Sequence, residues 1–173
     1  MIATPNQTIG PFWHLLEDPA WADLTRFGAA GERIVLLGRV TDGVGAPVAR
    51  ACVELWQTSP AASAVWDGFG RCATDADGWF RFVTLYPGGR PGVVAGGNRG
   101  QAPHVALMIL GSGLMRHLTT RVYFAGDPAN AGDALLASLD AARRETLVAV
   151  MDDGGWRLDI RLQGDGETVF LDV

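Results

Sequence analysis

The residues of this chain whose types could support catalysis or metal binding are few, and their spacing assembles no complete site. Histidine is a common metal ligand and general base, but His14, His104 and His117 are scattered, with no second ligand two or four residues away. A mononuclear metal site usually takes three or four nitrogen, oxygen or sulfur ligands. Cys52 and Cys72 match neither a zinc pattern nor a disulfide framework, and both lie in apolar, strand-like segments. We therefore expect both cysteines to be small buried hydrophobic residues.

Two short motifs resemble functional loops, but each lacks a required part. Asp75–Gly78 (DADG) resembles the beginning of a calcium loop, but Tyr86 occupies the twelfth position, where glutamate is needed. Gly111–Gly113 (GSG) resembles part of the strained turn that presents a nucleophilic serine, but no clear helix follows it. No glycine-rich loop leads into a helix with the lysine of a phosphate cradle. Both motifs are therefore expected to be turns.

Composition indicates an ordinary globular protein of one domain. Hydrophobic residues make up 48% of the 173 residues and charged ones 19%, and the net charge is −5. A protein that binds the nucleic-acid backbone needs a basic stripe, and the sequence has none. No apolar run is long enough to span a membrane, and the N-terminus lacks the pattern of a secretory signal. We therefore expect a cytoplasmic protein that contacts neither nucleic acid nor membrane.

Short segments punctuated by glycine and proline predict an all-β fold. In Trp156–Leu162 every second residue is apolar, as in a strand with one buried face. One short helix is predicted over Asp133–Arg143, and one long loop without secondary structure over Pro87–Gly100. The predicted strands are Arg33–Val40, Ala51–Gln57, Trp79–Leu85, His104–Leu110, Thr119–Phe124, Leu147–Met151, Trp156–Leu162 and Thr168–Asp172. We expect an antiparallel β-sandwich of about eight strands with an irregular N-terminal arm and one short helix.

The N-terminal arm combines residues that prevent regular strand pairing with aromatic side chains that are costly to leave in water. Thr4–Trp13 contains two prolines and a glycine beside Phe12 and Trp13. An irregular segment with such side chains normally docks. We expect the arm to pack against this domain's own core or against another chain.

Seven segments spread over nearly the whole chain follow one order and spacing. They are TPNQTIGPFW (4–13), GERIVLLGRVTDG (31–43), VELWQ (53–57), GFGR (68–71), HLTTRVYF (117–124), RETLVA (144–149) and WRLDIRLQGDGETVFLDV (156–173). Together they resemble the intradiol dioxygenases, and the first and last of them resemble the alpha subunits of that family in particular. The combination is far more specific than any one segment.

The resemblance implies a metal site whose ligands are mostly missing from this chain. In a catalytic chain of the family, two tyrosines and two histidines ligate ferric iron. The intervals Thr58–Phe69 and Arg90–Gln101, where the tyrosine ligands fall, contain no tyrosine, and Tyr86 lies off the ligand positions. Of the family's His-x-His pair, His104 keeps the first histidine and Ala106 replaces the second. His104 is therefore expected at a vestigial ligand position. No metal and no other cofactor is expected in this chain, and Fe(3+) is expected in a beta partner.

The resemblance also implies a function for a chain without iron. It implies a non-metal alpha subunit that pairs with an iron-bearing beta subunit as an αβ heterodimer repeated in a larger assembly. The assembled enzyme would open the catechol ring of protocatechuate with O2 to give 3-carboxy-cis,cis-muconate, and this chain alone is expected to be inactive. At the partner interface Thr8, Gly10, Pro11 and Phe12 are expected to form the wall of the substrate pocket. Ser112 stands where an arginine is expected, so a dioxygenase for another catechol is an alternative.

The resemblance implies a division of the chain at residue 30. Residues 1–30 are expected to form the N-terminal arm and partner-contacting segment, and residues 31–173 the intradiol dioxygenase-like β-sandwich domain. The missing ligands alone would favour a different class, a non-catalytic β-sandwich binding module. The Thr-x-Gly-Pro sequence of the arm favours the enzyme subunit. The two interpretations differ in whether the chain co-purifies with an iron-containing partner.

Overall fold

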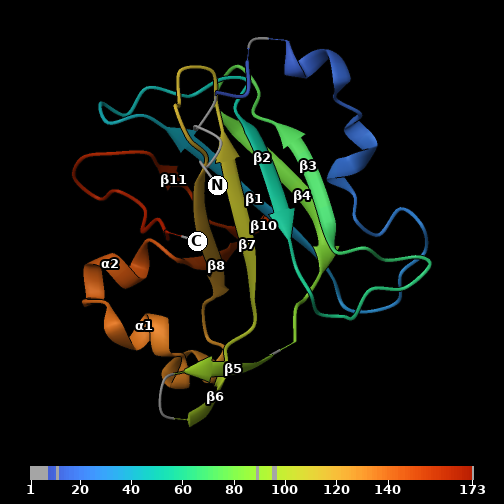
Figure 1. The fold of residues 1–173 in the computed structure, drawn as a ribbon, viewed down its shortest axis with the longest axis vertical. Coiled ribbons are helices and arrows are strands. Elements are labelled where there is room, and N and C mark those ends of the chain that lie inside the picture. Colours follow the sequence, from blue (N-terminus) through green and yellow to red (C-terminus); the bar gives the residue numbers. More distant parts are fainter. Residues whose placement is uncertain (1–7, 11, 89, 95–96, 173) are drawn as a thin grey trace, which may run out of the picture.

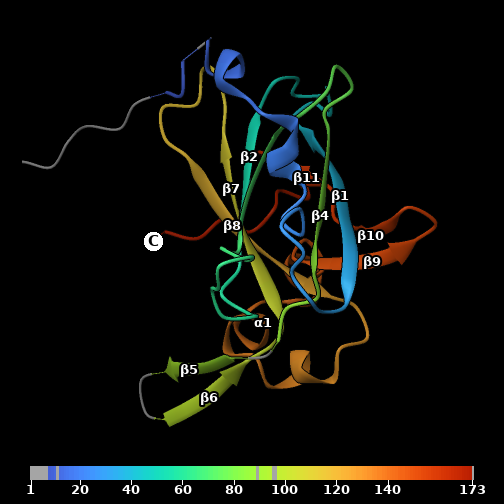
Figure 2. The ribbon, with the colours of Figure 1, turned by 90° about the vertical axis from the view of Figure 1, so that its right-hand side faces the viewer.

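Two layers of β-strands form the body of the protein (Figure 1). The computed structural model describes residues 8–10, 12–88, 90–94 and 97–172. One layer contains β4 (Trp79–Leu85), β1 (Arg33–Thr41), β10 (Gly155–Arg157) and β11 (Ile160–Arg161). The other contains β3 (Phe69–Ala73), β2 (Cys52–Trp56), β7 (His104–Leu110) and β8 (Leu118–Phe124). Strand β9 (Val148–Asp152) pairs with both β8 and β10, and it therefore joins the two layers, which Figure 2 shows side by side.

The core lies between the layers because alternate residues of the strands point inward. Strands β1 and β7 alternate between buried and half-buried positions along most of their length. Leu36 and Phe82 from one layer and Val53 and Leu107 from the other are wholly buried in one cluster. Strands β4 and β7 have the bounds predicted from the sequence. The prediction of an all-β sandwich is confirmed.

The prediction that the strands are antiparallel throughout is wrong. Strands β8 and β9 run parallel, and β1 runs parallel to both β10 and β11. Parallel neighbours need a long connection, and the segment with η3 (Pro128–Gly132), α1 (Ala134–Ser138) and α2 (Ala141–Glu145) provides one between β8 and β9. The alternating pattern of a strand does not depend on the direction of its neighbour, so it carries no signal of this arrangement.

The predicted strand Trp156–Leu162 is divided into β10 and β11. At the break, a carboxylate oxygen of Asp159 accepts a hydrogen bond from the backbone N–H of Arg39 at 3.0 Å, in place of a regular ladder partner. Gly38 allows the two backbones to approach closely, because a Cβ at this position would lie 1.9 Å from the carbonyl oxygen of Leu158. A side-chain hydrogen bond and a close backbone contact therefore interrupt a segment whose pattern is uniform.

The predicted helix Asp133–Arg143 is two short helices, so the prediction of one helix is wrong. Leu139, at the end of α1, has extended backbone angles, and Asp140 begins α2. The side chains of Asp133 and Asp140 accept hydrogen bonds from the first N–H groups of α1 and α2. Each helix therefore has its own N-terminal cap, which the spacing of the apolar residues did not indicate.

Two further predictions of local structure are wrong. Pro87–Gly100, predicted as a loop, contains the hairpin of β5 (Arg90–Val94) and β6 (Gly97–Gln101), which projects from the body (Figures 1 and 2). A hairpin can rest on backbone hydrogen bonds alone, so a glycine-rich sequence without alternation forms it too. Thr168–Asp172, predicted as a strand, makes only an isolated bridge to Thr119. At Val169 the hydroxyls of Thr120 and Thr146 bond the backbone C=O and N–H in place of a neighbouring strand.

The segment before β1 lies along the edge strand β3. It contains two short 3-10 helices, η1 (Trp13–Leu16) and η2 (Pro19–Ala22), and Asp18 caps the second by accepting a backbone hydrogen bond at 2.9 Å. Glu17 Oε1 accepts a hydrogen bond from the backbone N–H of Ala73 at 2.7 Å, so it satisfies a donor on the sheet edge. Within the described part of the chain, no helix has the length and apolar character needed to cross a membrane.

Candidate functional site

His104 is the first residue of β7, and its neighbours fix its ring. Nδ1 lies 2.8 Å from the carbonyl oxygen of Ala102, so this nitrogen carries the proton and donates. The ring packs against Tyr123, with 5.4 Å between the centroids. Tyr123 donates its hydroxyl to Asp133 at 3.2 Å, and Asp133 also accepts from the backbone N–H of Ala102 at 3.0 Å. Burial raises the pKa of Tyr123 to about 12, so the phenol keeps the proton that it donates. The imidazole is thus part of a hydrogen-bonded network.

A small cavity of about 90 Å³ lies beside His104. It is lined by Trp56, Gln57, Thr58, Ser59, Gly88, His104 and Ala106. The amide of Gln57 is committed to the framework: Nε2 donates to the carbonyl oxygens of Ser59 and Leu85, and Oε1 accepts from the Thr84 hydroxyl. The other lining side chains that contain nitrogen or oxygen are the His104 imidazole, the Thr58 and Ser59 hydroxyls, and the Trp56 indole.

These residues do not fit ferric iron. A mononuclear site takes three or four ligands, and this lining contains one imidazole and no phenol, thiol or carboxylate. Among the described residues, no three His, Cys, Asp or Glu side chains are grouped so that they could hold a metal ion. Tyr86 donates its hydroxyl to Asp127 at 2.7 Å, and burial together with this hydrogen bond raises the pKa of Tyr86. The phenol therefore stays protonated, unlike a tyrosinate ligand.

The arm is anchored to the body at two points. The hydroxyl of Thr8 donates to the carbonyl oxygen of Gly111 at 3.0 Å and accepts from the backbone N–H of Gly113 at 3.3 Å, and we call this pair of bonds the Thr8 clasp. The indole N–H of Trp13 donates to the carbonyl oxygen of Arg50 at 3.1 Å. Loop 111–113, which follows β7, is therefore bound directly to the arm.

Gly10 and Phe12 lie between these two anchors. Gly10 has a φ of +83°, a left-handed conformation, and a Cβ there would meet nothing within 4 Å. Glycine is therefore favoured at this position by backbone conformation and not by lack of space. Pro11, like residues 1–7, lies outside the described residues. Ser112 is exposed in the loop that the Thr8 clasp holds, so the structure brings Thr8 and Ser112 to the same place.

Thr8 and His104 lie at opposite ends of β7. His104 is its first residue and Gly111 follows its last, so at about 3.3 Å per residue the two places are roughly 20 Å apart. They therefore do not form one site within this chain. Nothing local in the sequence indicates the Thr8 clasp, because it joins residues 103 positions apart. The only signal was the turn-forming Gly-Ser-Gly sequence.

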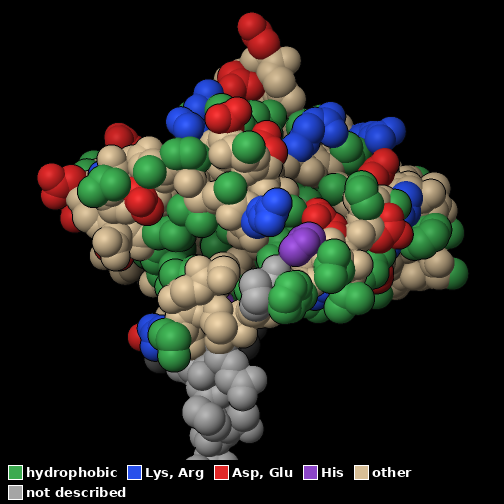
Figure 3. Space-filling model, turned by 90° about the horizontal axis from the view of Figure 1, so that it is seen from above, with side chains coloured by type: hydrophobic (Ala, Val, Ile, Leu, Met, Phe, Trp, Pro, Cys, Tyr) green, Lys and Arg blue, Asp and Glu red, His purple; other side chains and the backbone are tan. Residues whose placement is uncertain are grey.

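The N-terminal segment and the loop after β7 expose large apolar side chains. Phe12, Leu15 and Leu16 of the arm, together with Met115 from the loop after β7, are each at least 70% exposed. Figure 3 shows hydrophobic side chains among charged ones on the face seen from above. Exposed large apolar side chains of this kind are available for contact with another molecule.

The sequence matches known proteins over nearly its whole length. The family model described as dioxygenase matches residues 18–164. The protocatechuate 3,4-dioxygenase alpha chains of Burkholderia cepacia and Pseudomonas putida are 35% and 37% identical to this chain, over 98% of it and over 97% and 96% of their own lengths. The protocatechuate 3,4-dioxygenase beta chain of Burkholderia cepacia is 35% identical over 80% of this chain and 67% of its own length.

A solved structure agrees with the sequence match. Catechol 1,2-dioxygenase from Pseudomonas arvilla C-1 has a TM-score of 0.63 and 26% identity, covering 85% of this chain and 58% of that one. The layered arrangement of strands is therefore shared with an enzyme of the same class. The chain belongs to the intradiol dioxygenase family, among the alpha chains of the kind found in protocatechuate 3,4-dioxygenases.

Proposed function

We propose that this chain is the non-metal subunit of an enzyme that opens protocatechuate, and that it pairs with an iron-bearing beta subunit. The observation that carries the proposal is a donor set that does not fit iron, in a chain similar over 98% of its length to alpha chains of such enzymes. Similarity to a beta chain supports a partner of the same fold. We infer that the αβ pair is repeated in a larger symmetric assembly.

The chemistry in this proposal takes place on the partner's metal. Ferric iron in the beta subunit would supply a Lewis acid that activates the bound catechol toward O2. The bond between the two hydroxylated carbons opens, both oxygen atoms enter the product, and protocatechuate becomes 3-carboxy-cis,cis-muconate. This chain contributes binding, orientation and the exclusion of water, and it is inactive alone.

The arm supplies this chain's part of the substrate pocket in the proposal. The Thr8 clasp fixes loop 111–113, and the left-handed backbone of Gly10 turns the arm. Pro11 and Phe12 complete the wall that faces the partner. The exposure of Phe12 supports this assignment, because a partner surface would remove its ring from water.

The proposal includes a division of the chain and a compartment. Residues 1–30 act as the arm and partner-contacting segment, and residues 31–173 as the intradiol dioxygenase-like β-sandwich domain. We place the protein in the cytoplasm. Its two cysteines, Cys52 and Cys72, are free and buried, as is common in a reducing compartment.

Co-expression with a beta chain of the same enzyme tests the proposal. We expect the two chains to co-purify, the complex to contain iron, and the complex to consume one O2 per protocatechuate. The chain expressed alone should be iron-free and inactive. A stable, monodisperse monomer that ignores such a partner would refute the subunit proposal, and it would favour the non-catalytic binding module that the missing ligands also suggest.

Ser112 motivates a second candidate substrate. It stands in the clasped loop at a place where an arginine was expected, so a recognition group for the ring carboxylate is missing there. The alternative is the alpha chain of a dioxygenase for another catechol. Comparing kcat/KM of the complex for protocatechuate and for catechol separates the two. A preference for catechol would reassign the substrate and leave the subunit assignment unchanged.

A further inference from the structure

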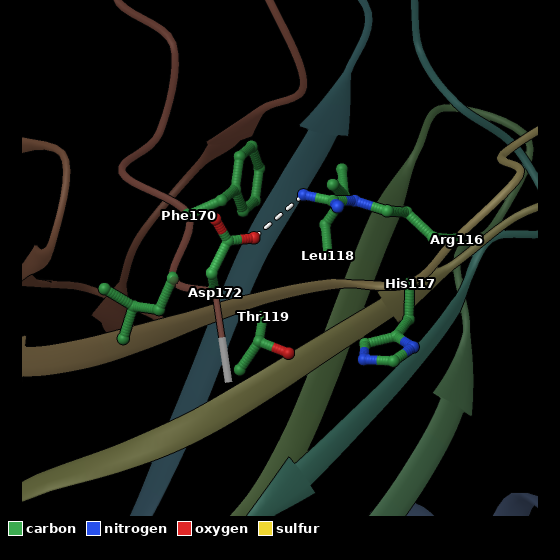
Figure 4. A pocket seen from close by; sticks show the side chains of 7 residues that line it. Arg116, His117, Leu118, Thr119, Phe170 and Asp172 are labelled. Atoms are coloured by element: carbon green, nitrogen blue, oxygen red, sulfur yellow. Dashed lines mark hydrogen bonds and ion pairs between the residues drawn. The ribbon is translucent and has the colours of Figure 1, made fainter. Parts of the chain in front are cut away.

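A second cavity, of about 250 Å³, lies at the beginning of β8. Figure 4 shows Phe170 and Asp172 on one side of it, Arg116 and His117 on the other, and Thr119 between them. The backbone N–H of Leu171 donates to the carbonyl oxygen of Thr119 at 2.8 Å, which ties the two walls together. The cavity is therefore part of the folded framework and is built from this chain alone.

The charged part of this cavity is an ion pair open to solvent. Arg116 Nη2 lies 2.9 Å from Asp172 Oδ1, and the two side chains are 60% and 92% exposed. An exposed pair of this kind adds little to stability, because water solvates both charges well. The guanidinium can therefore exchange Asp172 for another carboxylate at small cost, and its planar fork can hold both carboxylate oxygens. His117, also exposed, adds an imidazole to the same side.

The rest of the lining combines apolar surface with one shielded hydroxyl. Phe170 and Leu118 are half-buried, and both pack against the core while lining the cavity. The Thr119 Oγ1 atom is shielded from solvent and has no hydrogen-bond partner in the described structure. Because this atom is shielded, the contacts available to a ligand are those of the charged and apolar parts of the lining.

We propose that this cavity binds the carboxylate of a small aromatic acid. The Arg116 guanidinium takes the ligand carboxylate in place of Asp172, and the ring lies against Phe170 and Leu118. The volume of about 250 Å³ suits a single ring, because pockets for drug-sized molecules occupy roughly 300–1,000 Å³. Asp172 competes for the guanidinium, so binding is weak, with a Kd on the order of 1 mM. The site goes beyond the proposed function, since it needs no partner chain.

Titration of the full chain, labelled with nitrogen-15, with benzoate tests the site by NMR. We expect saturable shifts of the amides of residues 116–119 and 170–172. Arg116→Gln should weaken binding by at least about tenfold, because a charged hydrogen-bonded contact is lost. Asp172→Asn should strengthen it by roughly threefold, because the competing carboxylate is removed. Arg33→Gln is the matched control, because the Arg33 side chain is about as exposed as that of Arg116, pairs with Asp23 at 3.2 Å and lies outside the cavity lining.

Two further ligands separate the parts of the proposal. Benzyl alcohol has the ring without the carboxylate, and inorganic phosphate has the charge without the ring, so benzoate must bind more tightly than either. Equal binding of phosphate would overturn the proposal, as would an unchanged benzoate affinity in Arg116→Gln or a weaker one in Asp172→Asn. The titration uses this chain alone, whereas the proposed function is tested by co-purification and ring cleavage. Either one can therefore fail while the other stands.

Discussion

Replacing Thr8 with valine removes a hydroxyl that makes two hydrogen bonds and keeps the shape of the side chain. The bonds of the Thr8 clasp measure 3.0 Å to Gly111 and 3.3 Å to Gly113. A hydrogen bond contributes a net ~0.5–1.5 kcal/mol, and the longer, exposed bond belongs at the lower end. Together they give about 1.5 kcal/mol, which is roughly a tenfold shift between the docked and the released arm. The free energy of global unfolding should change little, because the arm can detach while the sandwich stays folded.

Hydrogen exchange of the Gly113 amide reports whether the Thr8 hydroxyl protects this donor. We expect exchange to be about tenfold faster in Thr8→Val, because a loss of about 1.5 kcal/mol corresponds to roughly a tenfold change in an equilibrium constant. Thr8→Ser is the matched control, since it keeps the hydroxyl and should exchange like the unchanged chain. In the complex with the beta chain, kcat/KM should fall in Thr8→Val and be retained in Thr8→Ser. Unchanged exchange at Gly113 in the valine variant would show that the hydroxyl does not hold the loop.

Three other predictions concern the framework, each checked by urea unfolding. The Glu54 side chain is 11% exposed in an ion pair with a partly buried arginine, so Glu54→Ala should lower the free energy of unfolding by about 2–4 kcal/mol. Arg33→Ala, in an exposed pair, should lower it by under ~0.5 kcal/mol, and equal losses would contradict this. Gly38→Ala would place a Cβ 1.9 Å from a carbonyl oxygen. It should prevent folding or cost more than ~3 kcal/mol, whereas Gly132→Ala, with nothing within 4 Å, should be neutral. Burial raises the pKa of Tyr123 from 10.0 to about 12, so its contribution to stability is complete below pH 10 and is lost as pH rises to about 12. Tyr123→Phe should reduce that slope, and an unchanged slope would contradict the assignment.

Strands with one buried face could be predicted from their residues, and interruptions that depend on distant contacts could not. Strand β4 alternates against the core and has the predicted bounds. The break between β10 and β11 lies at Asp159, which in the sequence is an ordinary polar residue of an alternating segment. What stops the strand is a hydrogen bond to the backbone of Arg39, 120 positions away. The parallel direction of β9 likewise depends on a crossover and not on the residues of the strand.

The candidate site likewise has one feature that the sequence could predict and one that it could not. The single imidazole at His104 was predictable, because the family's ligand positions can be compared with the sequence residue by residue. The Thr8 clasp was not predictable, because the hydroxyl meets its partners only after β7 has folded into the sheet. The assignment of Thr8, Gly10, Pro11 and Phe12 to the partner's pocket stays a prediction.

The side chains of Gln57 and His104 are bonded into the framework, which explains how the chain keeps the family's fold around a donor set that does not fit iron. Among the described residues, buried side-chain polar atoms without a partner belong to Thr119, Asn130 and Arg161, and none of these lines the cavity beside His104. A buried polar group left unpaired costs about 1–3 kcal/mol, so the loss of a ligand would normally weaken its surroundings. Here Gln57 is bonded at both ends of its amide and His104 to a backbone carbonyl. A chain of this family can therefore keep the framework without a donor set that fits iron.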